Sequence, residues 1–317
     1  MAKAAFQKGL SAVPHAESVN YVLQRFVTHK LPPNEERLRR KFARGLNHLE
    51  AYERYGPSRP FANAALYEFG AGWDLAIPLT FWMLGAEDQR LFDLRPNLRL
   101  ELVNVNLKRL ARLAPELEQQ FERPLRRPDP TPLHSLDGLE ERFGIRYRAP
   151  SDARHTNFQS GSMDFISSTV TLEHVPREDV VPLLRECRRL LRPDGILSAL
   201  IDLSDHFSQI DSSISRFNFL RYSDRTWRLI NSSLQHQNRM RHPDYAAALE
   251  EARLEIVWEK SVTAGEKQLD ALRELDLAER FRVYPFDELA VVRLRIVARA
   301  EPGASPDALE EAENVGS

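Results

Sequence analysis

The chain has 317 residues, of which 42% are hydrophobic, enough to bury the core of one large domain or two small ones. Its formal net charge of −2 at pH 7 provides no overall basic field that would point to nucleic acid as the main partner. Cys187 is the one cysteine, which excludes an intrachain disulfide and favours a reducing compartment, so a cytoplasmic location is expected.

Residues 1–60 predict a helical extension ahead of the main domain. Apolar positions recur at helical spacing within residues 16–55, on both sides of Leu31-Pro32-Pro33, which indicates two amphipathic helices. We expect these helices to form a lid over a site in the main domain. The N-terminal residues lack the apolar core of an export signal, and no apolar run reaches the roughly 20 residues that span a bilayer. Neither an export signal nor a transmembrane helix is expected.

From residue 61 the pattern changes to short apolar strands that alternate with helical segments, which is typical of βαβ units and a mostly parallel sheet. The expected strands are Ala65–Phe69, Arg90–Leu94, Ile145–Ala149, Met163–Ser168, Gly195–Ile201, Leu254–Trp258 and Ala290–Val297. The sequence therefore predicts a doubly wound α/β domain over residues 61–300. Residues 113–142 contain five prolines and predict a surface insertion, and the acidic residues 301–317 predict a disordered tail.

The turn after the first expected strand indicates a nucleotide-binding site. Glu68-Phe69-Gly70-Ala71-Gly72 joins that strand to a new helix, and its glycines allow the backbone to approach a ligand closely. A dehydrogenase would place a small residue where Leu75 stands, so NAD is disfavoured. Taken alone, the turn fits a ligand-free connection equally well.

Acidic residues follow the next two strands at the same edge of the expected sheet. Asp93 stands at the spacing where a carboxylate accepts both hydroxyls of a ribose, although capping of the helical segment that opens at Pro96 is an alternative. Asp152 follows the third strand and is a candidate acceptor for an adenine amino group, although a solvated carboxylate is the commoner explanation for such a loop.

Together these motifs resemble those of class I S-adenosylmethionine (SAM)-dependent methyltransferases. Their order carries the likeness, together with Met163–Ser168 and Leu191–Gly195 further along the chain. The resemblance implies a Rossmann-like, mostly parallel seven-stranded sheet whose last strand is antiparallel, with SAM as cofactor. The cofactor-binding residues that it implies are Glu68, Gly70, Ala71, Gly72, Asp93, Leu94, Asp152, Ala153 and Thr169. Asp74 replaces the usual third glycine and is a candidate helix N-cap.

Two histidines are the candidate catalytic residues. His174 lies in Leu172-Glu173-His174-Val175, which resembles a segment beside the sulfonium in small-molecule members of the family. His206 follows the fifth strand and is the preferred general base. A role for His174 in shaping the pocket alone is an equal alternative.

A metal site is disfavoured by the sequence. Asp202, Asp205 and His206 are a compact set of potential ligands, but they lack a diagnostic spacing, so no metal is predicted.

The segment after the fifth strand predicts the acceptor site. Arg221, Tyr222 and Trp227 are suited to stack on or hydrogen-bond a polar acceptor such as a sugar, with an aromatic packing face as the alternative. The favoured function is methyl transfer to a small or glycan-linked acceptor, with a hydroxyl oxygen as the first choice. The alternatives are transfer to carbon or nitrogen of another metabolite and a noncatalytic SAM-binding protein. An RNA methyltransferase is disfavoured, because no concentrated basic face is evident.

Overall fold

The computed structural model describes residues 31–209, 211, 213–231 and 236–301. Seven strands of this part form one mixed sheet in the order β3-β2-β1-β4-β5-β7-β6. The strands are β1 (Ala65–Phe69), β2 (Asp88–Phe92), β3 (Ile145–Arg148), β4 (Met163–Thr169), β5 (Leu191–Asp202), β6 (Leu254–Thr263) and β7 (Val291–Ala300). Strand β7 is antiparallel to both of its neighbours, and the pairs from β3 to β5 are parallel. The predicted doubly wound sheet with an antiparallel last strand is therefore confirmed.

Strands β2 and β5 begin before their expected first residues, and β6 and β7 extend beyond their expected ends, to Thr263 and Ala300. Strand β2 begins at Asp88, which pairs with Ala65, and it ends before Asp93. Strand β5 begins at Leu191, four residues before the expected start at Gly195. The reason is that Leu191 pairs with Met163 while the exposed Pro193-Asp194 pair interrupts the apolar pattern of the strand. Asp93 consequently lies beyond the end of β2, at the carboxyl edge of the sheet.

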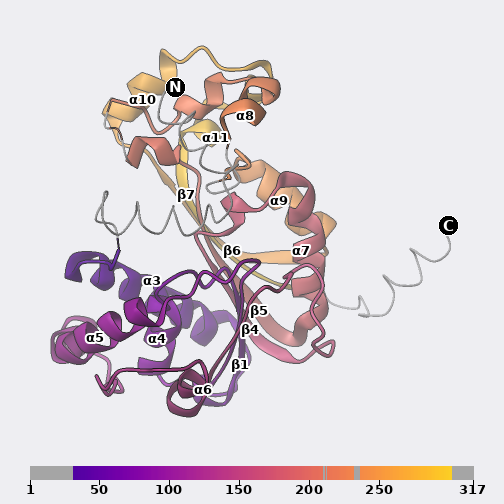
Figure 1. Ribbon diagram of the computed structural model, residues 1–317. Helices are drawn as coiled ribbons and strands as arrows, with labels where there is room; N and C mark the ends of the chain where they lie inside the picture. Colours follow the sequence, from indigo (N-terminus) through magenta and orange to yellow (C-terminus); the bar gives the residue numbers. More distant parts are fainter. Residues whose placement is uncertain (1–30, 210, 212, 232–235, 302–317) are drawn as a thin grey trace.

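Helices cover both faces of the sheet (Figure 1). On one face lie α3 (Glu35–Tyr55), α4 (Ala76–Met83) and α5 (Leu100–Phe121), and on the other α7 (Arg177–Leu190) and α9 (His242–Glu251). Alternate residues of β1 enter different cores, because successive side chains of a strand point to opposite faces. Leu66 packs in the cluster with α3 and α4, whereas Tyr67 and Phe69 pack in the cluster with α7 and α9.

Helix α3 is built into the domain rather than laid over it. The Asn34 side chain caps it by accepting from the Arg37 N–H at 2.9 Å, and Glu35 and Glu36 in the first turn complement the helix dipole. Its buried face extends from Leu38 to Tyr52. The second of the two expected helices is thus confirmed, whereas the first lies outside the described residues.

The structure narrows the predicted insertion at 113–142. Helix α5 continues through Pro115 to Phe121, so the first nine residues of that span belong to the crossover helix. Helix α6 (Asp137–Phe143) takes up the end of the span. Between them, Leu125 and Leu133 are buried against the core, so the connection is a packed loop. The prolines of this span suggested that the helix ends near residue 113, whereas α5 ends at Phe121.

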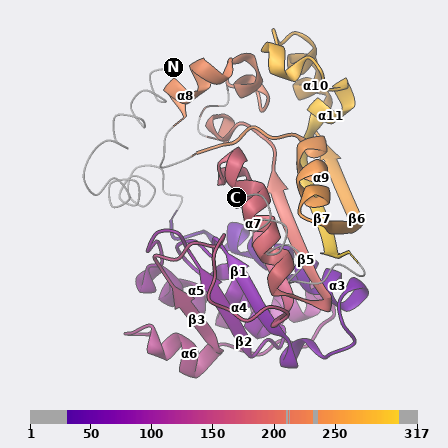
Figure 2. The ribbon, with the colours of Figure 1, turned by 90° about the vertical axis from the view of Figure 1, so that its right-hand side faces the viewer.

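A group of short helices lies beyond the end of the sheet at which β5 finishes (Figures 1 and 2). They comprise η5 (Asn218–Arg221), α8 (Asp224–Ile230), α10 (Glu266–Arg273), η6 (Glu279–Phe281) and α11 (Phe286–Ala290). Their apolar side chains share one cluster with the start of β7, so this group has its own small core. Within the described part of the chain, no helix is long and apolar enough to cross a membrane.

Candidate active site

The glycine turn after β1 requires its glycines. Gly70 and Gly72 have φ angles of +76° and +77°, in the left-handed region that glycine favours. A Cβ atom on Gly70 would lie 2.3–2.9 Å from atoms of the Thr171 side chain. At Gly72 the same position has no atom of the described chain within 4 Å. A side chain at position 70 would therefore clash with Thr171, whereas the space beside Gly72 is open and leaves room for a ligand.

Glu68 is a buried carboxylate at the end of β1. Its Oε2 atom has no hydrogen-bond partner among the described residues. Burial raises the pKa of Glu68 to about 8, and the nearby negative charge of Asp93 adds to the shift. Buried polar atoms are normally paired, so this oxygen fits a donor supplied by a ligand. The ammonium of the methionine part of SAM is such a donor, and the residues present fit that cofactor.

Asp93 is held in place from two sides. Its carboxylate accepts from the Tyr147 hydroxyl at 2.9 Å and from the backbone N–H groups of Ala71 and Gly72. Burial raises the pKa of Asp93 to about 7, although these hydrogen bonds oppose the shift. Helix α5 begins at Leu100, so Asp93 does not cap it as the alternative interpretation required. The carboxylate instead links β2 to the glycine turn.

A pocket of about 410 Å³ opens at the carboxyl edge of the sheet. Among the predicted cofactor residues, those that line it are Gly70, Asp93, Leu94, Asp152 and Ala153. The Asp152 carboxylate contacts the Arg154 guanidinium at 2.6 Å, which lowers the pKa of Asp152. Arg154 also contacts Asp179, on helix α7. The pocket thus brings together residues that follow β1, β2 and β3.

The remaining predicted cofactor residues do not line this pocket: Glu68, Ala71, Gly72 and Thr169. The Thr169 hydroxyl lies 3.1 Å from Nε2 of the buried His48 on α3. Nδ1 of His48 lies 2.8 Å from the Ser198 hydroxyl, and burial lowers the pKa of His48 to about 3. A neutral histidine therefore ties α3 to β4 and β5.

Asp74 binds the start of α4 without being its N-cap. The N-cap residue is Leu75, in the left-handed conformation, and the Asp74 carboxylate accepts from the Ala76 N–H at 3.0 Å. The same carboxylate forms a 2.6 Å ion pair with Lys41 of α3. The predicted N-cap is therefore displaced by one residue, because Leu75 supplies the non-helical backbone.

The two candidate catalytic histidines lie side by side. His174 ends η3 (Leu172–His174) after β4, and His206 begins η4 (His206–Gln209) after β5. Their ring centroids are 4.9 Å apart with an interplanar angle of 63°. His174 lines the pocket, whereas His206 does not line it and is buried. Nδ1 of His174 donates to the backbone carbonyl of His236 at 2.5 Å.

Gln237 and Asn238 hold both histidine loops in place, and neither residue was predicted from the sequence. The Gln237 side chain accepts from the His206 N–H at 3.0 Å and donates to the Ser204 carbonyl at 2.9 Å. The Asn238 side chain donates to the carbonyls of Leu172 and Val175, on either side of His174. No motif marks these amides in the sequence. Only the tertiary fold brings them to the ends of β4 and β5.

The predicted acceptor residues have unequal surroundings. The buried Trp227 donates from Nε1 to the Gln237 carbonyl at 2.9 Å, and the Arg239 guanidinium lies 4.9 Å from the centre of its ring. Tyr222 stacks on Trp227 with ring centroids 6.3 Å apart, and Arg221 is exposed. Trp227 thus occupies the packing face named as the alternative, and Arg221 and Tyr222 are the more accessible members of the set.

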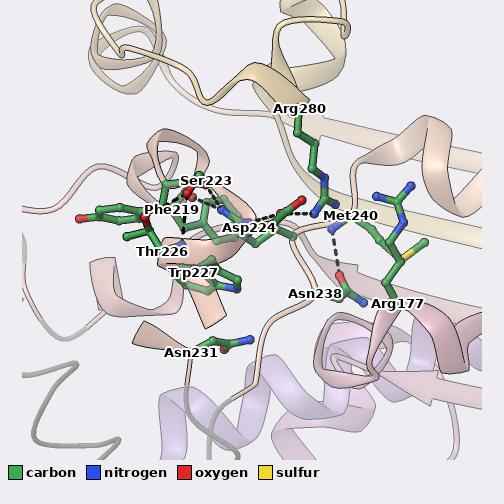
Figure 3. A network of polar contacts seen from close by, with 12 residues as sticks. Arg177, Phe219, Ser223, Asp224, Thr226, Trp227, Asn231, Asn238, Met240 and Arg280 are labelled. Carbon is green, nitrogen blue, oxygen red and sulfur yellow. Dashed lines mark hydrogen bonds and ion pairs between the residues drawn. The ribbon is translucent and has the colours of Figure 1, made fainter. Parts of the chain in front are cut away.

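Asp224 anchors this region at the start of α8. Its carboxylate accepts from Arg280 at 2.9 Å (Figure 3). It also accepts from Arg239 at 2.6 Å. Arg239 also donates to the carbonyls of Phe219 and Tyr222, so one side chain holds η5 and α8 together.

One segment of the chain is similar to known methyltransferases. A family model described as "Methyltransferase domain" matches residues 136–199. A ubiquinone biosynthesis O-methyltransferase from Xanthomonas oryzae pv. oryzae is 37% identical over 70 residues, 22% of this chain and 28% of the relative. The match thus spans little more than a quarter of that curated relative.

Two solved structures are similar to this chain at low sequence identity. The YcgJ protein from Bacillus subtilis is 13% identical with a TM-score of 0.43, over 82% of this chain and all of the other. A geranyl diphosphate methyltransferase in complex with SAM is 14% identical with a TM-score of 0.44, over 85% of this chain and 92% of the other. The family model matches one segment of the chain, and the observed strand order is the one that the resemblance of its motifs implied.

Proposed function

We propose that the chain transfers a methyl group from SAM to a hydroxyl oxygen of a small or glycan-linked acceptor. One observation carries the proposal: Gly70, Asp93 and Asp152, from the ends of three strands, line the same pocket as His174. Ligands of open α/β sheets bind at this edge. SAM, when bound, supplies an electrophilic methyl group on a sulfonium.

The residues around the pocket match the parts of SAM. The Glu68 carboxylate would bind the ammonium of the methionine part, and Asp93 would accept from the ribose hydroxyls. Asp152 would accept from the adenine amino group, between Leu94 and Ala153. The open side of Gly72 leaves room for the backbone to approach the cofactor.

We propose a hydroxyl oxygen as the acceptor atom because His174 and His206 lie beside each other near the pocket. Methyl transfer requires in-line placement of a nucleophile, and a hydroxyl nucleophile must also lose its proton. His206 is the proposed acceptor of that proton, with His174 beside it at the pocket wall. Arg221 and Tyr222 are the proposed contacts to the rest of the acceptor. The Xanthomonas relative is an O-methyltransferase, and its similarity to a segment of this chain supports oxygen over carbon and nitrogen.

The experiment has two stages. Calorimetry first measures SAM binding to the full-length chain, and a dissociation constant below about 1 mM is expected. The chain is then incubated with methyl-labelled SAM and fractionated cell extract, and the labelled product is identified. Label on a hydroxyl oxygen supports the proposal. Label on carbon or nitrogen overturns the acceptor atom, and SAM binding without any labelled product overturns the activity.

A further inference from the structure

A cluster of potential metal ligands lies at the ends of β4 and β5. One ligand atom each of Glu173, His174 and His206 lies within 4.8 Å of the other two. We propose that these three side chains form a binding site for a divalent transition-metal ion such as Zn²⁺. Two imidazoles and one carboxylate are a ligand set typical of such ions. This inference goes beyond the proposed function, because it concerns binding of the ion itself.

Glu173 supplies an unsatisfied carboxylate. Its side chain is 3% exposed, and its Oε2 atom has no hydrogen-bond partner in the described part of the chain. The carboxylate accepts a 3.3 Å hydrogen bond from the Asp202 N–H at its other oxygen, and it also accepts from the backbone N–H of Glu173 itself. A buried carboxylate oxygen without a donor is uncommon in a folded protein. A cation between the two loops would satisfy it.

His174 is prepared to act as a ligand. Its Nδ1 atom faces a carbonyl, which can only accept, so Nδ1 carries the proton. The Nε2 atom of the neutral ring therefore carries the lone pair that a metal requires. In metal sites of proteins, the histidine nitrogen that does not bind the metal typically donates its N–H to a carbonyl or carboxylate, as Nδ1 does here.

His206 reaches the cluster from the other strand. Its backbone is fixed by Gln237, and its ring packs against that of His174. Its Nε2 atom lies 3.8 Å from Oδ2 of Asp202, so a second carboxylate stands next to the site. The proposed ligands thus come from the loops after β4 and β5, and the side chains of Gln237 and Asn238 hold these two loops in place.

Binding requires only a small contraction. Bonds of about 2.0–2.2 Å to a zinc ion bring ligand atoms to roughly 3.5 Å from one another. Atoms now within 4.8 Å reach that separation by side-chain rotation. Arg44 of α3 opposes binding, because its positive charge acts on both Glu173 and Asp202. An Arg44→Met variant should therefore bind the metal more tightly.

Metal binding changes the role of the histidines. A metal ion and a proton cannot share the same lone pair, so in the metal-loaded protein His174 and His206 are ligands. The role of His206 as a proton acceptor then belongs to the metal-free protein. Activity measured after removal of metal with a chelator, and again after its return, separates the two states.

The test uses the full-length chain, freed of metal with a chelator, and Zn²⁺ or Co²⁺ alone. Calorimetry with Zn²⁺ should show one equivalent, and Co²⁺ should give visible absorption from a nitrogen- and oxygen-ligated ion. Glu173→Gln and His206→Gln should each weaken binding by at least about tenfold, and Arg44→Met should strengthen it several-fold. The matched control is His242→Gln. His242 contacts Glu259 and Glu288 through different ring nitrogens, and its loss should leave metal affinity unchanged.

Circular dichroism establishes that each variant is folded. Absence of an equivalent of bound Zn²⁺ in the unaltered chain overturns the proposal. Equal affinity in folded Glu173→Gln, or an equal loss in His242→Gln, also overturns it. Neither SAM nor an acceptor is present, so these outcomes leave the test of methyl transfer independent.

Discussion

The Tyr147 hydroxyl donates to Oδ2 of Asp93 at 2.9 Å, which joins the end of β3 to the residue that follows β2. The same carboxylate accepts from the backbone of the glycine turn after β1. Three neighbouring strands thus fix one side chain before any ligand arrives. Such prior ordering lowers the entropy that a ligand must lose on binding.

Asp93→Ala should weaken SAM binding at least tenfold, because loss of a charged acceptor for two hydroxyls costs about 1.5–3 kcal/mol. Tyr147→Phe should have a smaller effect in the same direction, since it removes only the group that orients Asp93. Calorimetry measures both. Asp88→Asn, at the opposite end of β2, is the control. Unchanged affinity in folded Asp93→Ala would remove this residue from the site.

SAM binding should be accompanied by proton release near pH 7. Glu68 has a pKa of about 8 because it is buried, so it is largely protonated at pH 7 without a ligand. A ligand ammonium favours the ionised form and lowers that pKa. Affinity should therefore rise between pH 6 and pH 8. Calorimetry in two buffers of different ionisation enthalpy measures the released protons, and Glu68→Gln should release fewer. Equal release by both proteins would contradict the assignment.

Gly70→Ala and Gly72→Ala should differ in their effects on protein stability and on SAM affinity. Both force a side chain into a left-handed backbone conformation, which costs about 1–2 kcal/mol. Only the Cβ of Ala at position 70 also meets the Thr171 side chain, so that variant should be the less stable. Gly72→Ala should retain more stability, while its new methyl group enters the open side of the turn and weakens SAM binding. Thermal unfolding and calorimetry distinguish the pair; equal stabilities would disprove the steric difference.

Phe42→Ala should lower the free energy of unfolding by about 3–5 kcal/mol, because this fully buried ring belongs to the core on the α3 face. Arg40→Ala, at a solvent-exposed position of the same helix, is the control. Denaturant unfolding measures both. Deletion of residues 1–55 should unfold the domain for the same reason. Deletion of residues 1–30 alone retains α3 and tests the predicted lid, which should then appear as weaker SAM or acceptor binding.

His206→Ala should separate binding from chemistry. SAM affinity should stay within about threefold, because the proposed cofactor contacts lie on other loops, whereas methyl transfer should fall by roughly 10²–10⁴. His174→Ala is the companion variant. A fully active His206→Ala enzyme together with an impaired His174→Ala enzyme would move the role to His174. Turnover with the identified acceptor, at fixed metal content, decides between them.

Periodicity and motif order predicted most of the sheet, because buried parallel strands and glycine turns leave strong local signals. Neither the start of β5 nor the end of α5 was predicted, since Pro193 and Pro115 resemble breaks in the sequence while strand pairing and helix packing continue through them. The predicted cofactor residues follow strand ends, where the sequence pattern is strong enough to propose them. The proximity of Glu173 to His206 could not be predicted in this way, because it depends on the adjacency of β4 and β5 and on amides more than 30 residues away.

The segment from Gln237 to Arg239 has a consequence for engineering. Gln237 and Asn238 secure the histidine loops, while Arg239 secures η5 and α8. The proposed acceptor contacts and the proposed catalytic histidines therefore depend on one short stretch of backbone. A chimaera that exchanges residues 217–231 for those of another enzyme must carry residues 236–241 with it. Without them the transplanted helices would lose their hydrogen bonds to Arg239, and the loops of His174 and His206 would pack against a segment from another protein.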